Sequence, residues 1–122
     1  MAIYELGKFG IKYHNKKLNI FGAEYTIKVY HPEDNEAPKD VNGLCEVYTK
    51  ELVIKDYTAV EDEKQYKNIY GFVEKVLRHE ILHAIFYEAG QGKYFEDEDL
   101  VDALAVMMPK ISKILQEVNN FK

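Results

Sequence analysis

The sequence has little cysteine, no excess of basic residues and no long apolar run. Its single cysteine, Cys45, has no partner for an internal disulfide or for a Cys-x-x-Cys metal site. Any bound metal must therefore be held by histidines and carboxylates. The net charge of −5 argues against a protein that binds duplex nucleic acid, because such proteins carry a basic surface that neutralises phosphates.

No stretch of the 122 residues approaches the roughly 20 apolar residues of a membrane span, and the first residues lack the apolar core of a signal peptide. We therefore expect no membrane partner and a cytoplasmic location. A composition that is 47% hydrophobic and 30% charged is typical of one globular domain with a buried core. We expect a single domain over residues 1–122, strand-rich over 1–57 and helical over 58–122.

The first sixty residues show the alternation of polar and apolar side chains expected of β-strands. In EYTIKVY, Tyr25, Ile27 and Val29 share one face, which predicts a strand with that face on the core. The stretch KFGIKYHNKKLNI, residues 8–20, predicts two short strands around a polar turn at residues 15–17.

A loop and a hairpin are predicted next. HPEDNEAPKDVNG, residues 31–43, is rich in turn formers and predicts a surface loop. LCEVYT (44–49) and ELVIKDY (51–57) have strand composition and predict a hairpin that turns across Lys50 and Glu51. We expect a small antiparallel or mixed sheet of three to five strands.

Two long helices are predicted after the strands. Thr58-Ala59-Val60-Glu61 matches a capping box and predicts a helix start, and Gly90 marks the expected helix end. The segment ILHAIFY within this helix is apolar nearly all round, which fits a helix between a sheet and another helix. The second helix is predicted from about Asp97 to about Val118, with a kink or a break at Pro109. The fold class is therefore α+β, with the small sheet packed on a long first helix and a C-terminal helix.

The stretch RHEILHAIFYEAG contains His79 and His83 four residues apart, with Glu80 directly after the first. On a helix this spacing puts both imidazoles one turn apart on one face, where they can bind one ion. Zinc is the metal that we expect from these ligands, with manganese, cobalt and iron as alternatives. Glu80 is close enough to act as general base by taking a proton from an attacking water molecule.

Glu98 is the predicted third ligand. Glu98 and Asp102 lie four residues apart at the acidic start of the last helix and so share a face. We expect Asp102 to accept a hydrogen bond from the far nitrogen of a ligand histidine and to fix its orientation. The alternative is that these acids only complement the helix dipole. Two histidines in predicted turns, which we expect to face solvent, and two neighbouring acids are weaker ligand candidates (His14, His31, Glu96 and Asp99).

HEILH followed by Glu98-x-x-x-Asp102 resembles the signature of the gluzincins, zinc metallopeptidases with a His-Glu-x-x-His and a Glu-x-x-x-Asp motif. The chain also resembles short peptidase-like proteins encoded by phages and prophages, which are similar to the ImmA/IrrE-type branch. The resemblance implies a minimal zincin-like fold with His79, His83 and Glu98 as zinc ligands. It implies Glu80 as the base, Asp102 as support for a ligand histidine, a protein or peptide substrate, and the cytoplasm of a bacterial or phage-infected cell.

Larger gluzincins have two features that the sequence does not assign. One is a distant His or Tyr that stabilises the oxyanion, for which Tyr48, Tyr87 and Tyr94 are candidates of the right type. The other is a second domain that forms the far wall of the cleft. Without it, a substrate would have to add to an edge strand, which we expect at residues 44–49. Two alternatives stay open: a catalytically silent, zinc-stabilised protein-interaction module of phage origin, and a metal-free structural or virion component.

Overall fold

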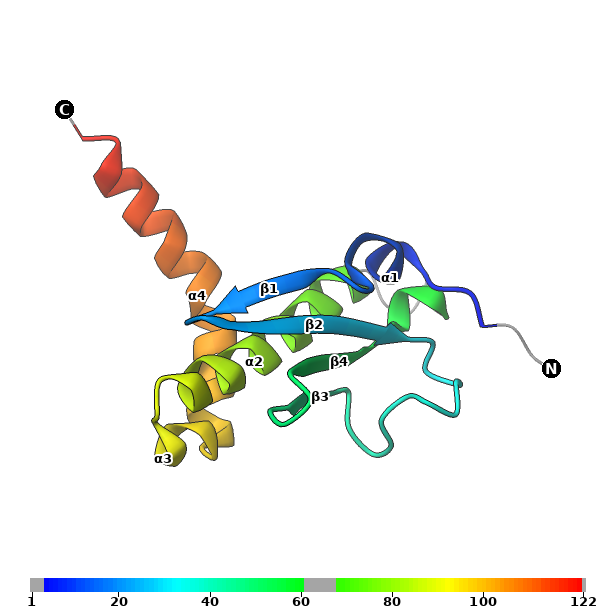
Figure 1. Cartoon of the computed structure of the whole chain (residues 1–122). Coiled ribbons are helices and arrows are strands. Elements are labelled where there is room, and N and C mark those ends of the chain that lie inside the picture. Colours follow the sequence, from blue (N-terminus) through cyan, green and yellow to red (C-terminus); the bar gives the residue numbers. More distant parts are fainter. Residues whose placement is uncertain (1–3, 61–67, 122) are drawn as a thin grey trace.

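The strands form one mixed sheet, with one long helix against it and the second long helix packed on the first (Figure 1). The computed structural model describes residues 4–60 and 68–121. The sheet has the order β1-β2-β4-β3, where β2 and β4 are parallel and the other neighbours are antiparallel. The strands are β1 (Lys17–Ile20), β2 (Ala23–Tyr30), β3 (Gly43–Glu46) and β4 (Glu51–Lys55). The predicted α+β class is confirmed.

The longest helices, α2 and α4, follow the sheet in the chain. The helices are α1 (Lys8–Tyr13), the 3-10 helix η1 (Tyr57–Ala59), α2 (Ile69–Glu88), α3 (Gly92–Phe95) and α4 (Glu98–Asn119). α2 contacts β3 and β4 on one side and α3 and α4 on the other, so it lies between the sheet and the last helix as its sequence predicts. The predicted helix end is confirmed, since Gly90 has a φ of 72° that favours glycine. Among the described residues, no helix combines the length and apolar character needed to cross a membrane.

The core lies between the sheet and α2. Tyr25, Ile27 and Val29 of β2 are buried, together with Leu52 and Ile54 of β4, while the residues between them are only half-buried. This is the alternation predicted for β2. A fully buried side chain of this kind contributes about 1.5–3 kcal/mol to folding. Helix α2 completes the cluster with three buried side chains (Val73, Leu77 and Ala84).

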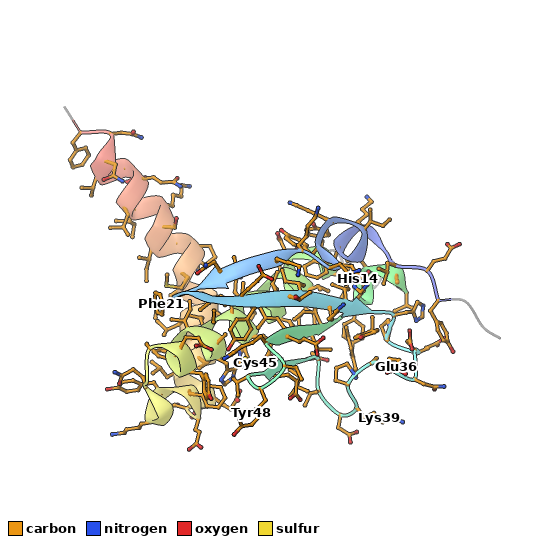
Figure 2. The ribbon with its side chains drawn as sticks, in the orientation of Figure 1. His14, Phe21, Glu36, Lys39, Cys45 and Tyr48 are labelled. Atoms are coloured by element: carbon orange, nitrogen blue, oxygen red, sulfur yellow. The ribbon has the colours of Figure 1, made fainter. Side chains whose placement is uncertain are left out.

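The predicted hairpin of β3 and β4 is confirmed, and the predicted surface loop before it contains no helix or strand over residues 31–42. β3 is shorter than the predicted 44–49, because it ends at Glu46, which pairs with Glu51. Residues 47–50 form the turn, and Figure 2 labels Tyr48 on its outer side. Within the described part of the chain β3 pairs with β4 alone, so its other edge is free.

The prediction of two strands in residues 8–20 is wrong for the first of them, which is helix α1. Its backbone N–H groups find an acceptor in the buried side chain of Asp56: Gly7 and Gly10 donate to Asp56 Oδ2 at 2.7 and 3.0 Å. A helix start needs such acceptors. The apolar side chains at positions 6, 9 and 13 have helical spacing, and Phe9 is fully buried. The acceptor that stabilises α1 lies more than forty residues away, so the local pattern does not reveal it.

The helix start predicted at Thr58 is also wrong. Thr58 lies inside η1, where its hydroxyl bonds to Asp56 and does not cap a longer helix. Glu61, its expected partner in the capping box, lies outside the described residues. Asn68 caps α2, with its side chain accepting the N–H of Gly71 at 3.2 Å.

α4 begins where predicted, since the side chain of Asp97 accepts the N–H of Leu100 at 3.0 Å. The helix runs through Pro109 without a break, so the predicted break at this residue is wrong. Pro109 has no N–H to donate to the carbonyl of Ala105, four residues earlier. Arg78 of α2 supplies the missing donor, with Nε 2.8 Å from the Ala105 oxygen. Because Pro109 does not donate to it, the Ala105 carbonyl can accept the hydrogen bond from Arg78 that joins α4 to α2.

Candidate metal centre

Two histidines of α2 and one glutamate of α4 place their ligand atoms side by side. His79 Nε2 lies 2.9 Å from Glu98 Oε2, and His83 Nε2 lies 3.0 Å from Glu98 Oε1. The two Nε2 atoms are 3.1 Å apart. Around a tetrahedral ion with bonds of about 2.0 Å, ligand atoms lie about 3.3 Å apart, so only small outward shifts are needed. These three residues could hold a metal ion.

The hydrogen bonds around the two imidazoles leave lone pairs facing the site. His83 Nδ1 lies 2.6 Å from the carbonyl oxygen of Phe95. Because a carbonyl can only accept, Nδ1 carries the proton and Nε2 presents a lone pair. His79 Nδ1 faces Asp102 Oδ1 at 3.5 Å, which favours the same tautomer. With both imidazoles in this tautomer and Glu98 ionised, three lone-pair atoms would face one another, an arrangement that a cation stabilises.

The site lies at the edge of the molecule and opens toward Glu98. His83 is buried, whereas the side chain of Glu98 is 69% exposed. Asp102 also contacts Lys75, whose Nζ lies 3.3 Å from the Oδ1 atom that faces His79. Lys75 stands four residues before His79 and so lies on the same face of α2. The Asp102 carboxylate therefore connects Lys75 to a candidate ligand histidine.

Glu80 is buried beside this group. Burial and, as the smaller cause, the nearby Glu98 carboxylate together raise the pKa of its carboxyl to about 8. A carboxyl that titrates near neutral pH is suited to proton transfer. The start of β3 approaches Glu80 closely: a Cβ atom at Gly43 would lie 3.1 Å from Glu80 Oε2 and 2.8 Å from Val76 Cγ1. Glycine at this position thus lets the strand pass over the carboxylate.

A cleft of about 620 Å³ runs between the start of β3 and α2 and contains both histidines and Glu80. Cys45, labelled in Figure 2, lines it from β3. Burial raises the pKa of the Cys45 thiol to about 12, so the thiol stays neutral and is not an activated nucleophile. The rest of the lining is mixed apolar and charged (Val41, Asn42, Gly43, Leu44, Phe72, Lys75, Val76, Phe95, Glu96, Glu98 and Asp102).

The five residues expected at the site are brought together, but the candidate tyrosines are not. As far as the described residues form the cleft, no tyrosine lines it. Tyr48 is 89% exposed on the β3–β4 turn. Tyr87 packs on Phe95 with ring centroids 5.6 Å apart, and Tyr94 packs on Phe86 at 5.7 Å.

The weaker ligand candidates stay outside the group of three ligands. His14 is half-buried and accepts the N–H of Val29 at Nδ1 (2.9 Å), so the expectation that it faces solvent is wrong. His31 accepts the N–H of Glu33 at 3.1 Å in the loop. Among the remaining acids, Glu96 lines the cleft without joining the ligand group.

Sequence reasoning missed three parts of the site. Lys75 has a readable signal, because it precedes His79 by one helical turn. The carbonyl of Phe95 has none, since every residue carries a carbonyl and α3, which positions it, is only four residues long. The role of Gly43 depends on how closely β3 packs on α2.

No family model matches the sequence, and neither a curated protein nor a solved structure is significantly similar to the chain. The resemblance to gluzincins therefore depends on the motif residues alone, and a function has to be argued from the chemistry of the site.

Proposed function

We propose that this protein is a zinc-dependent metallopeptidase. The observation that carries the proposal is the meeting of three lone-pair atoms, from His79, His83 and Glu98, beside a buried glutamate in a cleft. A purely structural cluster of two histidines and a carboxylate needs neither a nearby base nor an open cleft. A hydrolytic site needs both.

Two imidazoles and one carboxylate suit zinc, and three protein ligands leave a fourth position for water or substrate. When bound, zinc supplies Lewis acidity, which lowers the pKa of water and polarises a carbonyl group. The chain's part is to hold the ligands in place. The Phe95 carbonyl and Asp102 orient the two imidazoles from behind, so that both Nε2 atoms point into the site.

Glu80 is the proposed general base. It takes one proton from water as the water oxygen attacks the carbonyl carbon of the scissile bond. It then delivers this proton to the amide nitrogen, which leaves as an amine when the C–N bond breaks. Its buried position supports this role, because a carboxylate without a surrounding shell of water is a stronger base.

The free edge of β3 is the proposed site for the substrate backbone. An extended peptide that adds to residues 43–46 would form main-chain hydrogen bonds with the strand and lie along the cleft. The close approach of Gly43 to Glu80 would bring one peptide bond of such a strand near the proposed base. The edge strand β3 ends at Glu46 and so is shorter than the expected strand at residues 44–49. We propose the same function for it, which is to bind the substrate backbone.

The test combines zinc content with cleavage of a diverse pool of synthetic peptides, read by mass spectrometry. We expect about one zinc per chain, lost in His83→Ala together with cleavage. Glu80→Gln keeps the shape of the side chain but not its basicity, so it should retain zinc and lose cleavage. Glu74→Gln, on the same helix and outside the cleft, is the matched control and should retain both. Full cleavage by Glu80→Gln would refute the proposed mechanism.

Two observations favour a second candidate, a catalytically silent module whose metal only stabilises the fold. The ligands come from α2 and α4, so an ion would join these helices, and the cleft lacks a tyrosine among its described residues. On this alternative, removal of zinc lowers the unfolding temperature and no peptide is cleaved by the unmodified chain. Binding of no metal at all would exclude both candidates.

A further inference from the structure

The second half of α4 has no partner within the described chain. Figure 1 shows this helix running away from the sheet and from α2 toward the C-terminus. After Ala105, no residue of the helix is buried. Six apolar side chains along the helix and just beyond its end are between 39% and 77% exposed (Met107, Met108, Ile114, Leu115, Val118 and, after the helix end, Phe121), and Val106 is 42% exposed. Such a continuous apolar surface on a projecting helix is unusual unless something covers it.

The apolar residues form a regular stripe, which we call the α4 stripe. Leu104, Met108, Ile111, Leu115 and Val118 follow one another at steps of four, three, four and three, the spacing of a coiled-coil seam. Met107, Ile114 and Phe121, seven residues apart, lie along one side of this seam. The charged and amide side chains of this segment point to other faces of the helix (Lys110, Lys113, Gln116, Glu117 and Asn120).

The α4 stripe begins at the edge of the face that docks on α2. That face carries Val101 and Ala105, which pack against Leu82, and Leu104 packs against the same cluster. At 100° per residue, the direction midway between Val101 and Ala105 differs from that midway between Ile111 and Leu115 by roughly 80° around the helix axis. Beyond Leu104 the stripe therefore turns away from α2, and none of its residues is buried within the described chain.

We infer that the α4 stripe is a dimer interface, covered by the α4 stripe of a second copy in antiparallel orientation. In that orientation Met108 packs against Val118 of the second copy and Ile111 against its Leu115. Ile114 meets its own counterpart at the two-fold axis, and Met107 lies opposite Phe121. From Met107 to Phe121 each position of the stripe then finds an apolar partner, and the largest side chain meets a flexible methionine.

The size and shape of the surface support a second copy as the occupant. The exposed fractions of the six side chains amount to on the order of 500 Å² of apolar surface per copy, or about 1,000 Å² in a pair, which reaches the lower limit of specific interfaces. The antiparallel pairing places the two domains at opposite ends of the helix pair, whereas a parallel pairing would bring them together at one end. The stripe begins beyond Glu98 and Asp102, so the candidate metal centre stays outside this interface.

A membrane surface fits the same stripe less well. The polar face of the segment carries Lys110 and Lys113 but also Glu117, and the chain has no tryptophan. Helices that lie on anionic membranes have a strongly basic polar face and interfacial aromatic residues. Binding to vesicles is therefore an outcome of the test that would count against the dimer.

The first experiment is sedimentation equilibrium of the full chain from about 1 to about 100 µM. We expect the mass to rise from that of one chain to that of two. Ile114→Glu and Leu115→Glu should stay monomeric at all concentrations, with unchanged zinc content and circular dichroism. Ile11→Glu is the matched control, because Ile11 is also an exposed isoleucine on a helix, and it should dimerise like the unmodified chain. A chain that stays monomeric at the highest concentration, or that binds anionic vesicles as a monomer, would overturn the inference.

Cysteine crosslinking tests the orientation. In a Cys45→Ser background, Ile114→Cys places two thiols at the two-fold axis, and we expect a covalent dimer on mild oxidation. Leu115→Cys is the matched variant, since in the antiparallel register each Leu115 faces Ile111 of the other copy and the thiols are too far apart. Equal crosslinking of both variants, or crosslinking of Leu115→Cys alone, would refute the antiparallel arrangement.

Discussion

The hydrogen bond between Arg78 and the Ala105 carbonyl allows a direct test of what holds α4 against α2. Pro109 removes the backbone donor that this carbonyl would have in an ordinary helix, and Arg78 Nε replaces it at 2.8 Å. We predict that Arg78→Met destabilises the protein, because methionine keeps an apolar side-chain stem but cannot donate a hydrogen bond. Ala105 is fully buried, so its carbonyl would not easily find water instead.

The expected loss of stability in Arg78→Met follows from the loss of the hydrogen bond that Arg78 donates to the Ala105 carbonyl. A buried acceptor that loses its partner costs about 1–3 kcal/mol, which corresponds to a fall of about 1 M in the midpoint of urea unfolding for a domain of this size. Pro109→Ala returns a backbone N–H to the same carbonyl. In that background the loss of Arg78 should cost less than about 0.5 kcal/mol, so the two changes are strongly coupled.

The assay is urea unfolding followed by circular dichroism, for the four chains of this double-mutant cycle. All four chains are measured with a chelator, so that metal binding does not contribute to the free energy of unfolding. They are also measured at one protein concentration, so that self-association affects each of them equally. If Arg78→Met costs the same in both backgrounds, the arginine stabilises the fold through something other than the carbonyl freed by Pro109, and the reasoning is refuted.

Four further predictions concern other groups. Asp56→Asn leaves the N–H groups at the start of α1 with a poorer acceptor, and we expect urea unfolding to show a loss of about 1–3 kcal/mol. Hydrogen bonds from a lysine and a tyrosine lower the pKa of the Glu88 carboxyl, so its stabilising effect is complete above the unfolded-state pKa of about 4.3 and is lost as the pH falls below that value. Glu88→Gln should therefore make stability less dependent on pH in that range, and equal slopes would contradict this. The Cys45 thiol, with its pKa raised to about 12, should react with a disulfide reagent at pH 8 at least about tenfold more slowly in the folded chain than in urea. On the proposed function, Gly43→Ala should reduce cleavage more than zinc binding, because its methyl group would press on Val76 and Glu80 and not on a candidate ligand, and an equal loss of zinc would argue against this.

The sequence predicts those parts of the fold that depend on local patterns. The alternation in β2 and the all-round apolar character of α2 both correspond to burial on the faces that contact the core. The prediction for residues 8–13 is wrong because α1 is a single short helix, too short to be stable by its own propensity. Its start is held by Asp56, at the end of β4, and no pattern within the helix indicates that contact.

The candidate site shows the same division between local and distant contacts. His79, Glu80 and His83 lie within about one turn of one helix, so their geometry follows from helix periodicity alone. Glu98 reaches them only because α4 docks on α2, through Leu82 against Val101 and through the Arg78 bond. Neither contact belongs to the motif. The two histidines are therefore already positioned by α2, whereas the third ligand depends on packing between helices, and a change that loosens α4 should weaken metal binding without touching a ligand.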